Sequence, residues 1–201
     1  MVDKALRAPK KRLLEPLARR LGRVSPTALT LAGFGVGVMA AVAAALSQTW
    51  IALGLWLLNR TLDGLDGELA RARAKQTDFG GYLDIMADLA VYALIPLGLT
   101  LGQPAEITWL ALAVMLASFY INAGSWMYLS ALLEKRKQGA LERGEATSIT
   151  MPGGLIEGAE TIFFYCLFLL FPGLLAPLFF TLSALVLITI GQRLYWAYRT
   201  L

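Results

Sequence analysis

Acidic residues are concentrated in one stretch of an otherwise apolar sequence: six of the 14 aspartates and glutamates lie between positions 63 and 88. Four aspartates in this stretch form two pairs, one spaced by three residues and one by four. Residues with these spacings share one face of a helix, so two consecutive helices can direct their carboxylates toward each other. Carboxylates without histidine or thiolate suit Mg²⁺ or Mn²⁺, and two ions suit phosphoryl chemistry. The predicted metal ligands are Asp63, Asp66, Asp84 and Asp88.

Small residues lie on the same predicted helix faces as the aspartates. Gly67, Ala70 and Gly80 would allow close approach by another helix or by a ligand. Arg71 stands with two further cations, at positions 73 and 75, where an anionic substrate would enter. The alternative is a structural role in which Asp–Arg pairs stabilise the bundle. Arg60 and Arg71 could then neutralise two of the aspartates but not all four.

The residue types that are absent exclude several kinds of chemistry. The chain has no histidine, which excludes Ser-His-Asp hydrolysis, histidine-ligated zinc and imidazole acid–base catalysis. Its single cysteine, Cys166, lies in an apolar run and excludes both an intrachain disulfide and a cysteine-rich metal site.

The composition is that of a membrane protein. Of 201 residues, 57% are hydrophobic and 16% are charged, against about 25% charged in an average globular chain. A helix needs about 20 apolar residues to cross a bilayer, which leaves no room for a second soluble domain. We therefore expect an all-α integral membrane protein in which residues 26–201 form one catalytic domain with six transmembrane helices. Their expected ranges are about 26–47, 50–72, 79–101, 107–132, 155–171 and 174–198.

A basic segment precedes the first expected span. Leu13, Leu17 and Leu21 recur every four residues among eight lysines and arginines. An apolar stripe opposite cations is typical of an amphipathic helix that lies in the membrane interface. We expect residues 1–25 to form such a helix on the cytoplasmic side, with a disordered basic tail as the alternative.

The distribution of positive charge predicts the orientation of the chain. All of the 18 lysines and arginines except Arg60 occupy the N-terminal segment, the second and fourth connections, the C-terminal end and the adjoining helix ends. Cytoplasmic loops carry such an excess, so both termini are expected in the cytoplasm. This distribution also explains the pI of about 9.3, so a nucleic-acid partner is not needed to account for it. The acidic cluster would lie roughly 10 Å inside the membrane, at about 1.5 Å per residue, and open to the cytoplasmic side.

Residues 63–88 resemble a family signature. The pattern Asp63-x-x-Asp66-Gly67-x-x-Ala70-Arg71, followed after eight residues by Gly80-x-x-x-Asp84-x-x-x-Asp88, looks like the complete motif of the CDP-alcohol phosphotransferase family. The resemblance implies an enzyme of phospholipid biosynthesis. A CDP-linked lipid donor, usually CDP-diacylglycerol, is attacked by an alcohol hydroxyl to give a phosphodiester and CMP.

The resemblance also implies residue roles. Asp63, Asp66 and Asp84 would bind two Mg²⁺ or Mn²⁺ ions, and Asp88 would be both a metal ligand and the base that takes the acceptor proton. Gly67, Ala70 and Gly80 would line the nucleotide, and Arg71 would pair with a phosphate. A homodimer is implied by the resemblance alone. One departure is the start of the first span, Pro26-Thr27-Ala28-Leu29-Thr30, where many members have a Pro-Asn-x-x-Thr-like pattern.

Polar residues on other helices are candidates for the acceptor pocket. Two glutamates three residues apart at the start of the fifth span would repel a phosphorylated acceptor and favour a polyol or an amino alcohol, although they could instead cap that helix. The basic fourth connection leaves glycerol 3-phosphate or inositol phosphate open as the alternative. The candidate pocket residues are Asn59, Arg60, Asn122, Glu157 and Glu160.

A cation or proton transporter is the rival interpretation of the buried acidic residues. A transport path needs acidic groups through the whole membrane, whereas these are expected only in its inner half. The enzyme interpretation is therefore favoured.

Overall fold

The computed structural model describes residues 24–72, 76–139 and 153–201. Within these ranges it is helical and contains no strand, which confirms the all-α fold. The expected interfacial helix falls almost entirely on residues 1–23, outside the described residues. The helices are α2 (Pro26–Ala45), α3 (Thr49–Ala72), α4 (Asp78–Gly102), α5 (Glu106–Lys135), α6 (Gly158–Leu170) and α7 (Leu175–Thr200), with a short 3₁₀ turn, η1 (Pro172–Leu174), before α7.

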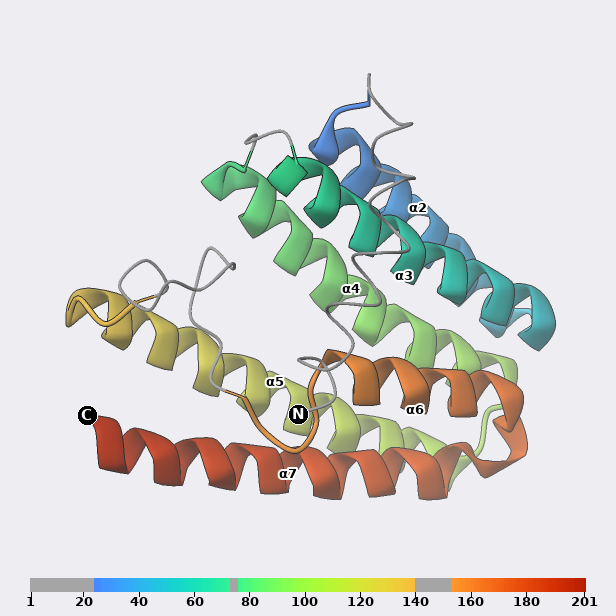
Figure 1. The fold of residues 1–201 in the computed structure, drawn as a ribbon. Helices are drawn as coiled ribbons and strands as arrows, with labels where there is room; N and C mark the ends of the chain where they lie inside the picture. Colours follow the sequence, from blue (N-terminus) through green and yellow to red (C-terminus); the bar gives the residue numbers. More distant parts are fainter. Residues whose placement is uncertain (1–23, 73–75, 140–152) are drawn as a thin grey trace.

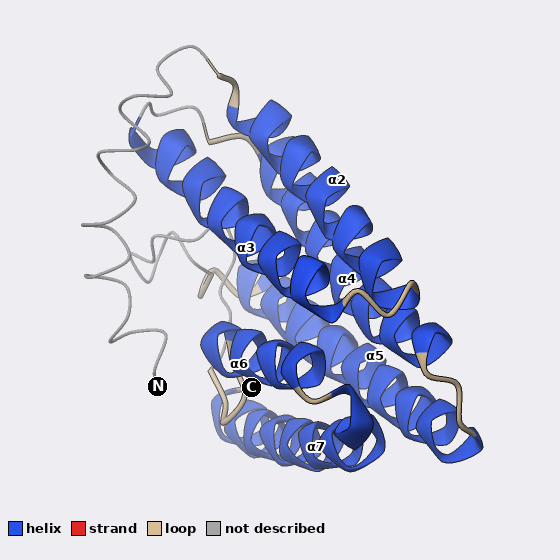
Figure 2. Ribbon diagram, turned by 90° about the vertical axis from the view of Figure 1, so that its right-hand side faces the viewer, coloured by secondary structure: helices blue, strands red, loops and turns tan. Residues whose placement is uncertain are grey.

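The helices form two groups joined by α6. Helix α2 packs against α3 and α4, and α5 packs along α7 (Figure 1). Helix α6 lies between the groups and contacts both α3 and α7, as Figure 2 shows. The end of α3 and the start of α4 lie at the same end of the first group. The acidic residues of the two helices are therefore placed side by side.

Aromatic side chains hold the two groups together. Trp56 of α3 stacks on Tyr165 of α6, with ring centroids 5.1 Å apart. Phe168 of α6 meets Phe179 of α7 edge to face at 4.8 Å. These four residues are fully buried, and edge-to-face or offset aromatic pairs are favourable beyond their burial. The cluster therefore holds α3, the helix that carries two of the aspartates, in a fixed position against α6.

Two helix starts are capped by hydroxyl side chains. Ser25 accepts the N–H of Ala28 at 3.1 Å, with Pro26 in the first turn of α2, as expected from the sequence. Thr77 accepts the N–H of Gly80 at 3.0 Å and starts α4 at Asp78. This cap fixes where α4 begins, and hence where its aspartates lie along the helix.

Four of the helical segments are long and apolar enough to cross a membrane: α2, α4, α5, and the stretch from Pro172 to Thr200. Among the described residues, four of the six expected transmembrane spans are therefore supported by length and composition. Helix α3 has 24 residues, but its second half carries the charged residues of the site. Helix α6 has 13 residues, or about 20 Å at 1.5 Å per residue, less than the ~30 Å of a hydrocarbon core.

Candidate active site

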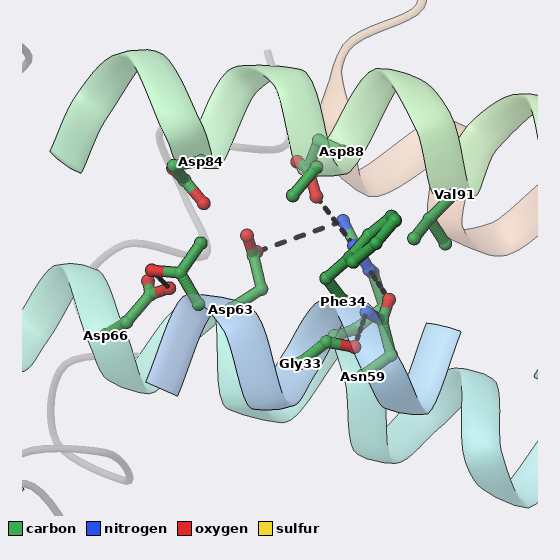
Figure 3. Close-up of a pocket in the computed structure, with 11 residues that line it drawn as sticks. Gly33, Phe34, Asn59, Asp63, Asp66, Asp84, Asp88 and Val91 are labelled. Atoms are coloured by element: carbon green, nitrogen blue, oxygen red, sulfur yellow. Dashed lines mark hydrogen bonds and ion pairs between the residues drawn. The ribbon is translucent and has the colours of Figure 1, made fainter. Parts of the chain in front are cut away.

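Three carboxylates from α3 and α4 meet in the space between these two helices, both of which pack against α2. Asp63, Asp66 and Asp84 each offer an oxygen within 4.8 Å of the others (Figure 3). Asp66 is buried and the other two are half-buried. The spacing of three residues on α3 places two of the carboxylates on one face, and α4 supplies the third. We call these three residues the carboxylate group; their oxygens match the hard ligands that Mg²⁺ and Mn²⁺ prefer.

The carboxylate group lies in a pocket formed by α2, α3 and α4. Helix α2 contributes an apolar wall, and the polar side chains come mainly from α3 and α4 (Figure 3). The pocket is lined by Thr30, Gly33, Phe34, Asn59, Arg60, Asp63, Asp66, Asp84, Ala87, Asp88 and Val91.

Thr30 is a pocket residue to which the sequence analysis gave no role. Its hydroxyl donates to Asp66 Oδ2 at 2.6 Å and also lies 3.2 Å from the carbonyl oxygen of Pro26. A hydrogen bond to a carboxylate oxygen restricts its orientation. The threonine belongs to the segment Pro26–Thr30, which the sequence comparison noted only for its departure from the family pattern. The sequence feature that could have identified Thr30 is its position four residues after the proline that starts the helix.

Asp88 lies in the same pocket but is paired differently. Its Oδ1 accepts a hydrogen bond from the Arg60 guanidinium at 2.7 Å, and the same guanidinium lies 3.9 Å from Asp63 Oδ2. Arg60 therefore stands between Asp88 and the carboxylate group. From the sequence, Asp88 was predicted to be a metal ligand together with the other three aspartates. The structure brings all four into one pocket, but Asp88 is not among the three whose oxygens converge.

The residues expected around the nucleotide lie near the exposed end of α3 and the start of α4. Arg71, which was expected to pair with a phosphate of the nucleotide, forms a salt bridge with Glu68 at 2.8 Å in this structure. A Cβ added at Gly67 would lie 3.3 Å from the guanidinium nitrogens of Arg71, and one added at Gly80 would lie 3.0 Å from the capping oxygen of Thr77. Gly80 therefore has a local packing reason beside the expected nucleotide contact, whereas the Arg71 side chain next to Gly67 is exposed and can move aside. Ala70 is half-buried.

The expected acceptor residues separate into three places. Asn59 and Arg60 line the carboxylate pocket. Asn122 lies on α5 and accepts a hydrogen bond from Arg193 of α7 at 2.7 Å. The third place is the start of α6, where Glu157 and Glu160 lie.

Arg193 is a buried cation that the sequence analysis missed as a site residue. It is 6% exposed, and it also donates to Ser125 Oγ at 2.6 Å. Its position near the C-terminal end of the last span made it one of many expected cytoplasmic charges. Two features of the sequence could have identified it: its position about two turns inside an apolar helix, and the Asn122 and Ser125 pair on the fourth expected span.

The two glutamates at the start of α6 serve as a helix cap. The Glu157 side chain accepts an N–H from the first turn, and the Glu160 side chain accepts the N–H of Glu157 at 3.1 Å. Glu157 also accepts the N–H of Gly154 at 3.2 Å. This reciprocal capping satisfies backbone donors that the helix leaves unpaired. The capping role accounts for the two glutamates without any contact with an acceptor.

Comparison with known proteins gives the family context. The sequence pattern of the family described as CDP-alcohol phosphatidyltransferase matches residues 23–190. Inner membrane protein YnjF of Escherichia coli (strain K12) is 40% identical over 204 residues, covering 100% of this chain and 97% of the relative. Archaetidylinositol phosphate synthase of Pyrococcus horikoshii is 30% identical over 159 residues, covering 77% and 83% of the two chains.

The fold is shared with a solved structure. Phosphatidylinositol phosphate synthase of Mycobacterium tuberculosis, solved with CDP-DAG bound, aligns with a TM-score of 0.71 at 22% identity over 93% of this chain and 94% of the other. The same synthase in complex with manganese and citrate aligns with a TM-score of 0.69 at 22% identity over 91% and 88% of the two chains. With its apolar helices and its membrane-protein relative, the chain is a multi-pass integral membrane protein.

The expectation of an unphosphorylated polyol or amino alcohol as acceptor is corrected by these findings. The two glutamates on which it was based are accounted for as the cap of α6. The two synthases just described are named for making phosphatidylinositol phosphate and archaetidylinositol phosphate, products that carry a phosphorylated inositol.

Proposed function

Because the chain belongs to the CDP-alcohol phosphatidyltransferase family, we propose that it transfers the phosphatidyl group of CDP-diacylglycerol to the hydroxyl of a phosphorylated alcohol. A bond forms between the hydroxyl oxygen and the lipid-side phosphorus. The bond from that phosphorus to the bridging oxygen breaks, and CMP leaves. The observation that carries this proposal is the carboxylate group beside Asp88 in one pocket of a membrane protein.

The carboxylate group fits a divalent cation. Its donors are carboxylate oxygens from Asp63, Asp66 and Asp84, a set that suits Mg²⁺ or Mn²⁺. We propose that these residues hold two ions; when bound, the ions would neutralise charge on the phosphoryl oxygens. Asp88 as a fourth ligand stays a prediction.

The side chains of the pocket have separate tasks in this proposal. Asp88 takes the proton of the acceptor hydroxyl, as a general base within reach of the nucleophile. Thr30 holds the Asp66 carboxylate in one orientation. Gly67, Ala70 and Gly80 line the nucleotide, and Arg71 exchanges its Glu68 partner for a donor phosphate.

We place the phosphate of the acceptor at Arg193. A planar guanidinium suits phosphate oxygens, and this one is held between α5 and α7 by Asn122 and Ser125. Three further cations, Lys135 to Lys137, follow at the end of α5. The names of the relatives support inositol phosphate as the acceptor, and glycerol 3-phosphate also carries the phosphate that this arrangement requires.

Arg193→Gln is expected to raise the KM for a phosphorylated acceptor by roughly 10- to 100-fold, the range for losing a charged hydrogen bond of about 1.5–3 kcal/mol. The KM for CDP-diacylglycerol should stay within about twofold, because the donor does not use this residue. Steady-state CMP release at varied acceptor and donor measures both constants. Arg199→Gln, which removes an exposed cation from the same helix, is the control. An unchanged KM for the acceptor would show that Arg193 does not bind the acceptor.

The membrane arrangement is also part of the proposal. We propose that all six described helices lie in the bilayer, with residues 26–201 as one catalytic domain. Both termini and the mouth of the site face the cytoplasm, as the inside-positive distribution of lysine and arginine supports. The homodimer implied by the family stays a prediction.

The reaction class and the metal are tested together by CMP release from CDP-diacylglycerol. Purified protein in detergent should release CMP with Mg²⁺ or Mn²⁺, stop after EDTA treatment, and recover when either ion is added back. Full activity after exhaustive chelation would contradict the metal proposal. No CMP release with any alcohol, from protein that still binds a CDP-linked nucleotide by calorimetry, would contradict the proposed donor and acceptor. No nucleotide binding at all would favour the transporter interpretation instead.

A further inference from the structure

Arg60 is a buried cation whose hydrogen bonds are directed to three different side chains. It is 9% exposed. Its Nη2 donates to Asp88 Oδ1 at 2.7 Å, its Nε donates to Asn59 Oδ1 at 2.8 Å, and its Nη1 donates to the Tyr92 hydroxyl at 3.1 Å. Each nitrogen of the fixed guanidinium fork therefore has a partner in the protein.

Two aromatic rings hold the guanidinium of Arg60. Its central carbon lies 4.7 Å from the ring centroid of Trp56 and 5.1 Å from that of Tyr92. The two rings meet edge to face at 5.9 Å. A cation at these distances is attracted to the ring faces, so both the position and the plane of the guanidinium are restricted.

The partners of Arg60 are themselves fixed by other helices. The side-chain amide of Asn59 donates to the carbonyl oxygen of Gly33 on α2 at 2.8 Å. The carbonyl oxygen of Tyr92 accepts from the hydroxyl of Tyr165 on α6. Contacts from α2 and α6 thus fix the partners that α3 and α4 offer to Arg60, and Nη2 of Arg60 donates to Asp88. Figure 3 shows Asp88 and Asn59 in this pocket.

We infer that Arg60 is a positioning residue, which fixes one oxygen of the Asp88 carboxylate and so turns the other toward the acceptor hydroxyl. The inference rests on the proposed function, in which Asp88 is the base. Arg60 binds Oδ1 of Asp88, and Oδ2 is the oxygen that receives the proton. This replaces the expectation that Arg60 contacts the acceptor, because its donors are directed to protein side chains.

Lysine cannot reproduce this arrangement. It carries the same charge on a flexible stem, but it lacks the planar fork that reaches three partners at once beside the two rings. Arg60→Lys and Arg60→Gln should therefore both lower kcat, on the order of 10²-fold, the scale for a reacting group displaced by about 1 Å. The KM values for the donor and for the phosphorylated acceptor should stay within about threefold.

A kinetic comparison separates positioning from acceptor binding. Arg60→Lys and Arg60→Gln are measured by CMP release at varied donor and acceptor, with Arg199→Gln as the control, since Arg199 contacts Tyr195 at the exposed end of α7. A large fall in kcat with little change in either KM supports the inference. A tenfold or greater rise in the acceptor KM at unchanged kcat would overturn it and make Arg60 a phosphate ligand.

A thermal-unfolding cycle tests the pair without using activity. Melting temperatures in detergent are compared for wild type, Arg60→Gln, Asp88→Asn and the double variant. Removing one partner of a buried ion pair is more costly than removing both, so the double variant should lose less than the sum of the two single losses. Strictly additive losses would overturn the inference. The cycle is informative even if wild type releases no CMP, an outcome that would contradict the proposed function alone.

Discussion

Asp88→Asn is expected to lower kcat for CMP release by about 10³-fold, within the 10²- to 10⁴-fold contribution of a general base. The amide oxygen can still accept the hydrogen bond from Arg60 that Asp88 Oδ1 accepts now, so the pocket should keep its shape. The change removes the charged oxygen that takes the hydroxyl proton. Affinity for the CDP-linked donor, measured by calorimetry, should stay within about threefold.

The matched control for this variant is Asp78→Asn. Asp78 lies on the same helix, in the first turn of α4, and is exposed. The Asp78→Asn variant should retain wild-type turnover. If Asp88→Asn turned over at more than a tenth of the wild-type rate, Asp88 would lose the role of base.

Asp84→Asn is expected to lower turnover by at least 10²-fold and to weaken Mn²⁺ binding by a comparable factor. Asp84 is the member of the carboxylate group that comes from α4, so its loss leaves only the two α3 oxygens. An amide is a weaker ligand for a hard cation than a carboxylate because it carries no charge. Mn²⁺ binding is followed by the electron paramagnetic resonance signal of free ion, and turnover by CMP release.

The binding measurement makes this prediction independent of catalysis. Asp78→Asn again serves as the control, because it removes one carboxylate from α4 without touching the group. Equal Mn²⁺ affinity for wild type and Asp84→Asn would show that the ion is held elsewhere.

The convergence of the carboxylate group was predictable from spacing. Asp63 and Asp66 share a helix face at three residues, and the short connection from α3 to α4 favours placing Asp84 at the same end of the helix group. The partner of Asp88 was not predictable. Spacing places a side chain on a face, but it does not say which of several charged neighbours it will contact. Arg60 was recognised as a candidate partner for an aspartate, yet the sequence could not reveal the rings and amide that hold it.

Tertiary contacts also explain the difference at α6. The sequence predicted a helix from about residue 155, and the helix begins at Gly158. The N–H groups of Leu155 and Ile156 donate to side chains of Gln192 and Thr189 on α7, both at 2.9 Å. The first N–H groups of a helix have no partner within it, and here α7 binds these two donors in a segment that precedes the helix. No local pattern carries that information, and the same is true of the Arg193 contacts with α5.

The central claim is that this membrane protein transfers a phosphatidyl group from CDP-diacylglycerol to a phosphorylated alcohol. The most direct test compares matched acceptors: inositol phosphate against inositol, and glycerol 3-phosphate against glycerol. Each is supplied with CDP-diacylglycerol and Mg²⁺, and CMP and the lipid product are quantified. The proposal predicts CMP and a phosphodiester lipid in equal amounts with at least one of the phosphorylated acceptors and little with its unphosphorylated counterpart. Equal or faster release with inositol or glycerol would contradict it.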